Sequence, residues 1–248
     1  MGPMRIALFV LSALLLRAQA PAPAQPAPPP PSRLDQLEKF INDYGNTARY
    51  AADDAKVPPP AAGEDRVVFM GDSITDIWGR GQGVFFPGKP YINRGIGGQV
   101  TPQMVLRFHQ DVIALKPKVV VIMAGTNDIG GNIGPMTLEA TEEYLLSMID
   151  MARGNRIRVV LASLTPVSDY IKPQTARRSP EKILALNRWI KDYAAKNDCV
   201  YLDYFSATVD DTGMFRKELT YDGLHPNAAG YEVMTPLAER AIAQALAK

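Results

Sequence analysis

A chain of 248 residues, with 46% apolar and 21% charged residues, has the composition of a globular protein with room for one large core. The formal net charge is +1 and the Lys and Arg residues are scattered, so no global field favours nucleic acid. The lone Cys199 excludes an intrachain disulfide and a cysteine-based zinc site, and His109 and His225 are the only two candidates for an imidazole base.

The N-terminus has the pattern of an export signal. Arg5 precedes an apolar run over 6–16, and residues 18–20 form an A-x-A cleavage pattern. The run is shorter than the about 20 apolar residues of a transmembrane helix. We therefore expect 1–20 to be a cleaved signal peptide, which leaves no stable membrane span and predicts a periplasmic or secreted protein. An uncleaved anchor is the alternative.

The next segment, 21–31, is almost all Pro and Ala and predicts an extended linker. Residues 32–60 form an N-terminal helical segment, which we predict to pack on the main domain, 61–248. Ser32 is a candidate N-cap with Asp35 three residues later. Apolar residues then recur at helical spacing: Leu34, Leu37, Phe40, Ile41 and Tyr44.

From residue 65 onward, short apolar strands alternate with amphipathic helices. The predicted strands are 66–70, 91–92, 118–124, 158–162 and 199–203. The predicted helices are 101–115, 137–153, 179–197 and 228–247. This alternation predicts βαβ units and a parallel sheet with helices on both faces. Such sheets bind ligands at the carboxyl ends of their strands.

Four polar, glycine-containing segments lie in the predicted loops of this fold. Residues 71–75 read GDSIT, 93–98 read NRGIGG and 125–128 read GTND, each directly after a predicted strand. Residues 222–226 read DGLHP and precede the last helix. We expect all four segments on one rim of the sheet.

Together these segments contain the groups that acyl transfer requires. Ser73 lies at a strand-to-helix turn that exposes its hydroxyl, and His225 is a candidate base. Asp222, three residues before it in one short loop, is placed to fix the tautomer of the histidine. Gly98 offers a backbone N–H and Asn127 a side-chain amide as donors to an oxyanion.

The four segments, in this order, resemble the four sequence blocks of the SGNH hydrolases, also called GDSL esterases or lipases, over residues 65–247. The resemblance implies a flavodoxin-like three-layer α/β/α fold with five parallel strands in the order 2-1-3-4-5, here with an extra N-terminal helix. It implies that Ser73 is both nucleophile and oxyanion donor, that Gly98 and Asn127 complete the oxyanion hole, and that the last block supplies acid and base. Gly97 is the alternative to Gly98. The stretches around the second and third blocks look most similar to acylhydrolases related to the platelet-activating-factor acetylhydrolase subunit.

Other polar and aromatic residues in these segments have simpler interpretations. We interpret Asp72 and Asp128 as acceptors for loop N–H groups rather than as a carboxylate pair. His109 falls in a predicted helix and is expected at its surface. Three aromatic residues are predicted to pack in the core or at the rim rather than to line an acyl or sugar pocket: Trp78, Phe85 and Phe86.

The sequence therefore predicts a serine ester hydrolase that cleaves short-chain esters of a small molecule, lipid or glycan through an acyl-enzyme, with no cofactor and no metal. Two separated histidines and no cysteine cluster give no zinc ligand set. The G-x-S-x-G pattern of α/β-hydrolases and a G-x-G-x-x-G at the first strand are both absent. The alternative from another class is a catalytically inert carbohydrate-binding or surface protein on this scaffold. The complete set of catalytic residue types argues against it.

Overall fold

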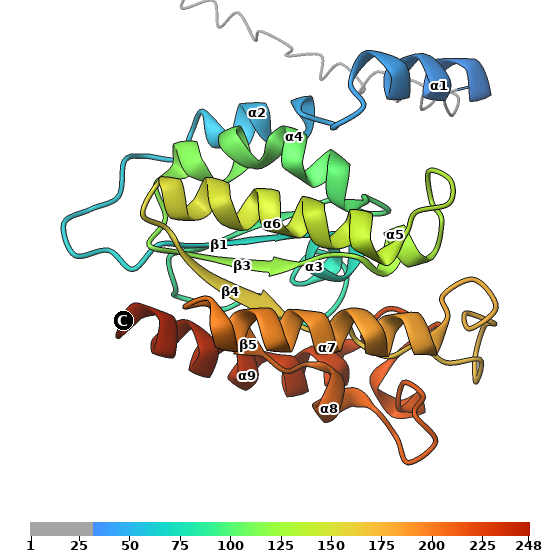
Figure 1. Ribbon diagram of the computed structural model, residues 1–248. Helices are drawn as coiled ribbons and strands as arrows, with labels where there is room; N and C mark the ends of the chain where they lie inside the picture. Colours follow the sequence, from blue (N-terminus) through green and yellow to red (C-terminus); the bar gives the residue numbers. More distant parts are fainter. Residues whose placement is uncertain (1–31) are drawn as a thin grey trace, which may run out of the picture.

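The computed structural model describes residues 32–248, so the predicted signal peptide and the Pro/Ala-rich linker lie outside the described residues. Five parallel strands form one sheet in the order β2-β1-β3-β4-β5, between two layers of helices (Figure 1). The strands are β1 (Val67–Gly71), β2 (Tyr91–Gly95), β3 (Val119–Met123), β4 (Arg158–Ala162) and β5 (Val200–Leu202). The predicted α/β fold and strand order are confirmed.

Different helices cover the two faces of the sheet. On β1, Val68 and Met70 point into one apolar cluster and Val67 and Phe69 into the other, as the alternation of side chains along a strand requires. The first cluster includes residues of α4 (Thr101–Asp111), α6 (Leu138–Gly154) and α7 (Pro180–Lys196). The second includes residues of α3 (Ser73–Ile77) and α9 (Ala228–Leu246). The remaining elements are α1 (Arg33–Asn42), α2 (Ala48–Asp54), α5 (Thr126–Ile129), α8 (Phe205–Thr208) and two 3₁₀ turns, η1 (Ile113–Leu115) and η2 (Lys217–Leu219).

Short polar side chains set where the long helices begin. Thr137 accepts a hydrogen bond from the Ala140 N–H at the start of α6 (3.1 Å), and Asn227 accepts one from the Gly230 N–H at the start of α9 (3.0 Å). Ser179 caps α7 in the same way, directly before a proline in the first turn. Each cap satisfies an N–H group that has no partner inside its helix, which explains why the predicted and observed helix starts agree.

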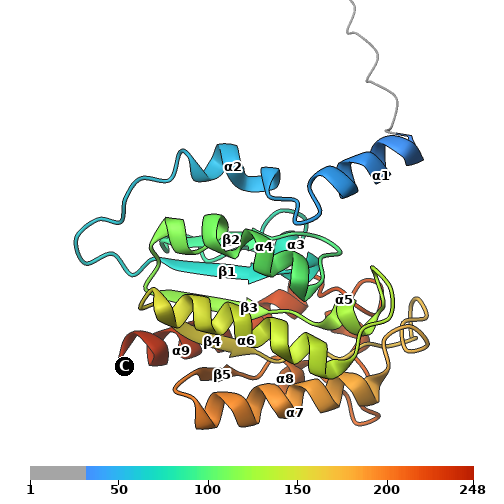
Figure 2. The same cartoon turned by 45° about the horizontal axis from the view of Figure 1, so that its top comes forward.

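The N-terminal helix differs from the prediction. Its cap is as expected, because Ser32 and Asp35 exchange hydrogen bonds of 2.9 and 3.1 Å. Its apolar residues, however, are largely exposed: 64% for Leu34, 48% for Leu37 and 75% for Ile41. Figure 2 shows α1 extending beyond the helices that cover the sheet, whereas α2 lies against them. The prediction that this helix packs on the domain is wrong, because apolar spacing marks a face of a helix without identifying a surface that covers it.

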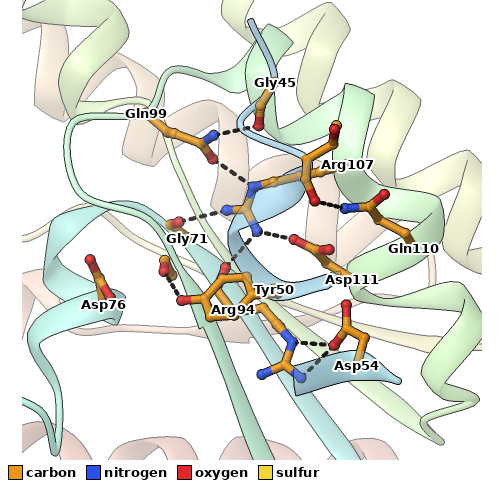
Figure 3. A network of polar contacts seen from close by, with 12 residues as sticks. Gly45, Tyr50, Asp54, Gly71, Asp76, Arg94, Gln99, Arg107, Gln110 and Asp111 are labelled. Atoms are coloured by element: carbon orange, nitrogen blue, oxygen red, sulfur yellow. Dashed lines mark hydrogen bonds and ion pairs between the residues drawn. The ribbon is translucent and has the colours of Figure 1, made fainter. Parts of the chain in front are cut away.

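A buried guanidinium joins several elements near the end of β1 (Figure 3). Arg107, on α4, is fully buried and forms an ion pair of 2.9 Å with Asp111. Its remaining N–H groups donate to the carbonyl oxygens of Gly71 (3.2 Å) and Arg94 (2.7 Å) and to the Gln99 side chain (2.6 Å). One side chain thus ties together the last residue of β1, the strand β2 and the loop that follows β2.

The same network holds the N-terminal segment against the sheet. The Gln99 side-chain amide donates to the carbonyl oxygen of Gly45 (2.8 Å), and the Tyr50 hydroxyl donates to the Gly95 carbonyl oxygen. Arg94 donates to Asp54, on α2, through Nε (2.8 Å). Unlike α1, the stretch from residue 44 to α2 is therefore fixed to β2 and to the loop that follows it.

We expect Arg107→Met to lower the free energy of unfolding by about 3–5 kcal/mol, because it leaves the buried carboxylate of Asp111 without its counter-ion. Urea unfolding measures this loss. The double variant Arg107→Met/Asp111→Leu should recover part of it, since both charges are then removed. A single variant as stable as the wild type would contradict the assigned role of this ion pair.

Candidate active site

Ser73 stands at the end of β1, in a turn with very little free space. An added Cβ on Gly71 would lie 2.1 Å from the Thr75 hydroxyl and 2.9 Å from the Met123 carbonyl oxygen, so only glycine fits there. Asp72 then caps α3 by accepting a hydrogen bond from the Ile74 N–H (2.9 Å). The serine is the first residue of α3, and its hydroxyl faces the pocket described below.

The candidate nucleophile, base and acid form one hydrogen-bonded chain. Ser73 Oγ lies 2.8 Å from His225 Nε2, and His225 Nδ1 lies 2.8 Å from Asp222 Oδ2. The other carboxylate oxygen of Asp222 accepts from the backbone N–H groups of His225 (2.8 Å) and Leu224 (3.0 Å). The structure thus brings together residues that are 152 positions apart in the sequence.

Two groups next to this loop restrain the histidine. The Thr220 hydroxyl donates to the His225 carbonyl oxygen (2.7 Å), and the Tyr221 ring stacks on the imidazole with centroids 5.7 Å apart. Burial acts to raise the pKa of Asp222, but hydrogen bonds from the backbone and ring of His225 and from the Leu224 N–H outweigh it and hold the pKa below its ordinary value. An ionised Asp222 favours the tautomer that carries its proton on Nδ1, which leaves Nε2 free to accept a proton from Ser73.

The second segment offers two glycine N–H groups, and they are not equivalent. The Gly97 N–H donates to Asp76 Oδ2 (3.1 Å). The Gly98 N–H has no hydrogen-bond partner among residues 32–248, and Gly98 has a φ of +78°, in the region that favours glycine. Asn132 holds the Gly98 carbonyl oxygen (2.9 Å). Of the two, only the Gly98 N–H is free to meet a ligand.

Asn127 lies in α5 and is buried beside the backbone of Gln99. Its Nδ2 donates to the Gln99 carbonyl oxygen (3.0 Å) and lies 3.5 Å from Asp72 Oδ2. Its Oδ1 accepts a hydrogen bond from Arg178 Nη2 (3.1 Å). Because a guanidinium can only donate, this contact identifies the oxygen end of the amide, so Nδ2 is the end that faces Gln99 and Asp72.

The two other aspartates serve the loops, as predicted. Asp72 is the cap of α3, and its complete burial raises its pKa to about 6, although the hydrogen bond from Ile74 acts to lower it. Asp128 accepts from the backbone N–H (3.0 Å) and the hydroxyl (2.5 Å) of Thr101 at the start of α4. Burial raises the pKa of Asp128 as well.

A cavity of about 890 Å³ opens in front of these groups. The candidate nucleophile, the base and both non-serine oxyanion donors line it. The remaining wall combines apolar and polar side chains, including Ile77, Ile96, Gln103, Asn132, Ile133, Arg177, Arg178 and Leu224. Four further wall residues come from the N-terminal segment: Phe40, Asp43, Tyr44 and Asn46.

Two parts of this wall could not be identified from sequence patterns. Gln99 and Gln103 help to hold the N-terminal residues at the pocket by binding the carbonyl oxygens of Gly45 (2.8 Å) and Tyr44 (2.7 Å). The two arginines come from the loop 163–179, which carries no recognisable motif. By contrast, the prediction that Trp78, Phe85 and Phe86 pack in the core or at the rim is confirmed. They pack with one another and with Phe69.

The remaining predictions concern groups outside the pocket. His109 is exposed on α4, as expected. Within residues 32–248, no group of three or more His, Cys, Asp or Glu side chains is arranged to hold a metal ion. Nor does the described part of the chain contain a helix with the length and apolarity needed to cross a membrane.

Residues 69–233 match the GDSL-like Lipase/Acylhydrolase family, and the chain belongs to this family. The fold agrees with solved members. A GDSL-like lipase from Bacteroides thetaiotaomicron is 39% identical, with a TM-score of 0.75 over 82% of this chain and 99% of the other. The resemblance to SGNH hydrolases inferred from the four segments is therefore confirmed.

Curated relatives are more distant. The chain is 24% identical to an acetylxylan esterase from Geobacillus stearothermophilus, over 68% of this chain and 90% of the relative. It is 28% identical to the platelet-activating factor acetylhydrolase IB subunit alpha1 of Pongo abelii, over 68% and 71%. A multidomain esterase from Ruminococcus flavefaciens is 33% identical over 48% of this chain, but the match spans only 14% of that longer protein. Family membership and these relatives support carboxylic ester hydrolysis.

The buried Asp72 provides a test of the local electrostatics. Its folded-state pKa of about 6 lies above the ordinary value of 3.8, so the folded protein binds a proton more tightly than the unfolded chain and loses stability as the pH rises between these values. Asp72→Asn keeps an oxygen to cap Ile74 but cannot titrate. Relative to the wild type, we expect the variant to gain up to about 3 kcal/mol between about pH 4 and about pH 7. Urea unfolding at each pH measures the difference, and a difference independent of pH would contradict the assigned burial effect.

Proposed function

We propose that this protein is a serine ester hydrolase that works through an acyl-enzyme. The observation that carries the proposal is the hydrogen-bonded chain from Ser73 through His225 to Asp222, with its serine end in an open pocket. Family membership supports the same chemistry. The alternative, an inert binding protein on this scaffold, does not require a serine, a histidine and a carboxylate at hydrogen-bond distances.

In the acylation step, Ser73 Oγ attacks the ester carbonyl carbon while His225 Nε2 takes the hydroxyl proton. The carbonyl oxygen becomes an oxyanion, which would receive hydrogen bonds from the backbone N–H groups of Ser73 and Gly98 and from Asn127 Nδ2. The Gly98 assignment is supported by the engagement of the Gly97 N–H with Asp76. Collapse of the intermediate breaks the bond to the alcohol, which leaves with the proton returned by His225.

Deacylation repeats these roles with water as the nucleophile. His225 takes a proton from the water, whose oxygen attacks the acyl carbon, and the same donors hold the second oxyanion. Collapse then returns the proton to Ser73 and releases the carboxylic acid. Asp222, whose pKa is held low, stabilises the positive charge on the imidazole in both steps.

For the substrate we propose a short-chain ester, with an acetyl group on a glycan or lipid as the favoured case. Two relatives carry names that refer to the removal of acetyl groups, an acetylxylan esterase and a platelet-activating factor acetylhydrolase subunit. The mixed apolar and polar pocket wall is compatible with a polar alcohol moiety. We further propose that residues 1–20 direct export to the periplasm or the medium, where such esters are accessible.

Hydrolysis of p-nitrophenyl acetate by the purified protein and by Ser73→Ala tests the proposal. We expect the variant to lose activity on the order of 10⁴-fold or more, the scale reported for loss of a triad serine. Ser147→Ala, at an exposed serine of α6, is the matched control and should keep full activity. Equal rates for the wild type and Ser73→Ala would contradict the proposed function.

The same assay, with other esters, tests the proposed acyl length and alcohol class of the substrate. A series of p-nitrophenyl esters with increasing acyl length should show kcat/KM falling from the acetyl ester onward. Acetylated xylan and acetylated pectin, assayed beside an acetylated lipid, separate the two favoured alcohol classes. A kcat/KM that rises with acyl length would contradict the short-chain assignment.

A further inference from the structure

Two neighbouring arginines in the pocket wall have no part in the proposed reaction steps. Arg177 and Arg178 lie in the loop 163–179 between β4 and α7, far in sequence from the four catalytic segments. Arg178 is only 6% exposed. A buried guanidinium is costly unless its charge is compensated, yet neither arginine forms an ion pair with a carboxylate in the described part of the chain.

The contacts of Arg178 are instead with amide oxygens. Its Nη2 donates to Asn127 Oδ1 (3.1 Å), and its Nη1 donates to Gln174 Oε1 (3.2 Å). The guanidinium packs closely on the loop after α5, because an added Cβ on Gly130 would lie 3.3 Å from its Cζ. Its charge is therefore directed at the residue that the reaction needs as a side-chain oxyanion donor.

Arg177 binds two residues of the chain that follows Asn127. Its Nε donates to the Gly130 carbonyl oxygen (2.8 Å), and its Nη2 donates to Asn132 Oδ1 (2.8 Å). The amide nitrogen of Asn132 in turn donates to the carbonyl oxygen of Gly98 (2.9 Å). Arg178 thus contacts Asn127 directly, and Arg177 is linked to Gly98 through Asn132.

An asparagine amide can present either its oxygen or its nitrogen, and only the nitrogen end stabilises an oxyanion. If the Asn127 amide flipped, its NH₂ group would face the donors of Arg178 and its oxygen would face the developing negative charge. The hydrogen bond from a cation to Oδ1 opposes this orientation, as does the hydrogen bond from Nδ2 to the Gln99 carbonyl oxygen (3.0 Å). The bond to Oδ1 also withdraws electron density from the amide, which makes Nδ2 a stronger donor.

We propose that Arg178 is a positioning residue of the oxyanion hole, which locks and polarises the Asn127 amide so that Nδ2 meets the oxyanion. The inference rests on the proposed ester hydrolysis and adds a residue to it. Burial and the neighbouring charge of Arg177 lower the pKa of Arg178, and the charges of Asp72 and Asp222 offset this lowering only in part. Since a guanidinium stays protonated throughout the range of protein assays, this positioning does not depend on pH.

Kinetics of Arg178→Met on p-nitrophenyl acetate test the inference, because methionine keeps an apolar stem but cannot donate. We expect kcat to fall on the order of 10- to 100-fold with KM changed by less than about 2-fold, the pattern of an interaction made in the transition state. Arg178→Lys, which retains one charged donor, should recover part of the loss. Arg188→Met, at an exposed arginine of α7, is the matched control and should keep the wild-type kcat.

A double-mutant cycle separates positioning from a general structural role. Asn127→Ala alone should lower kcat on the order of 10²–10³-fold, the usual cost of one oxyanion donor. If Arg178 acts through Asn127, Arg178→Met has almost no further effect in the Asn127→Ala background. Losses that multiply, or a loss confined to KM, would overturn the inference.

The remaining outcomes are also decisive. Urea unfolding of each variant shows whether it is folded, and if Arg178→Met is not, the same cycle is run with Arg178→Lys. A wild-type rate that does not depend on Ser73 would overturn the proposed function itself. Multiplicative losses with a rate that does depend on Ser73 would overturn only the role of Arg178.

Discussion

The buried ion pair of Arg107 and Asp111 is the interaction on which the geometry of the site most depends. The Arg107 guanidinium donates hydrogen bonds to the carbonyl oxygen of Gly71, the first residue of GDSIT. It also donates to the side chain of Gln99, the residue after Gly98. The backbone of Gln99 accepts the hydrogen bond of Asn127. A single buried charge therefore sets the separation between the serine turn and the two other candidate oxyanion donors.

The sheet and the loops contribute different parts of the candidate site. The parallel sheet brings β1, β2 and β3 to one rim, where Ser73, Gly98 and Asn127 follow their carboxyl ends. The loop before α9 adds the candidate acid and base, Asp222 and His225, from a part of the chain about 100 residues further on. Side chains outside the proposed proton transfers hold the surrounding groups: Asp76 binds the Gly97 N–H, Thr220 binds the His225 carbonyl oxygen, and Arg178 binds the Asn127 side chain.

The sequence was sufficient for features that local patterns encode. The all-apolar run of β3 and the amphipathic stretches 137–153, 179–197 and 228–247 predicted β3, α6, α7 and α9 within a few residues. GDSIT, GTND and DGLHP indicated Ser73, Asn127 and the Asp222–His225 pair, because parallel topology requires such segments to meet at one rim. The roles of these residues in the reaction remain a prediction.

Features that depend on which surfaces meet could not be predicted. The apolar stripe of α1 suggested packing, yet Leu34 and Ile41 face solvent, since periodicity does not supply a covering surface. The choice between Gly97 and Gly98 depends on Asp76, which is 21 residues from Gly97 and in no motif. Arg178 reaches Asn127 from 51 residues away through a loop with no sequence pattern.

The central claim is that Ser73 is an activated nucleophile, and covalent trapping tests it most directly. The protein is incubated with a p-nitrophenyl alkylphosphonate, released p-nitrophenolate is counted, and the adduct is located by peptide mass spectrometry. We expect one equivalent of p-nitrophenolate released per chain, with the phosphonyl group on Ser73, and little labelling of His225→Ala. A label on another residue, no label, or labelling that persists unchanged without His225 would contradict it.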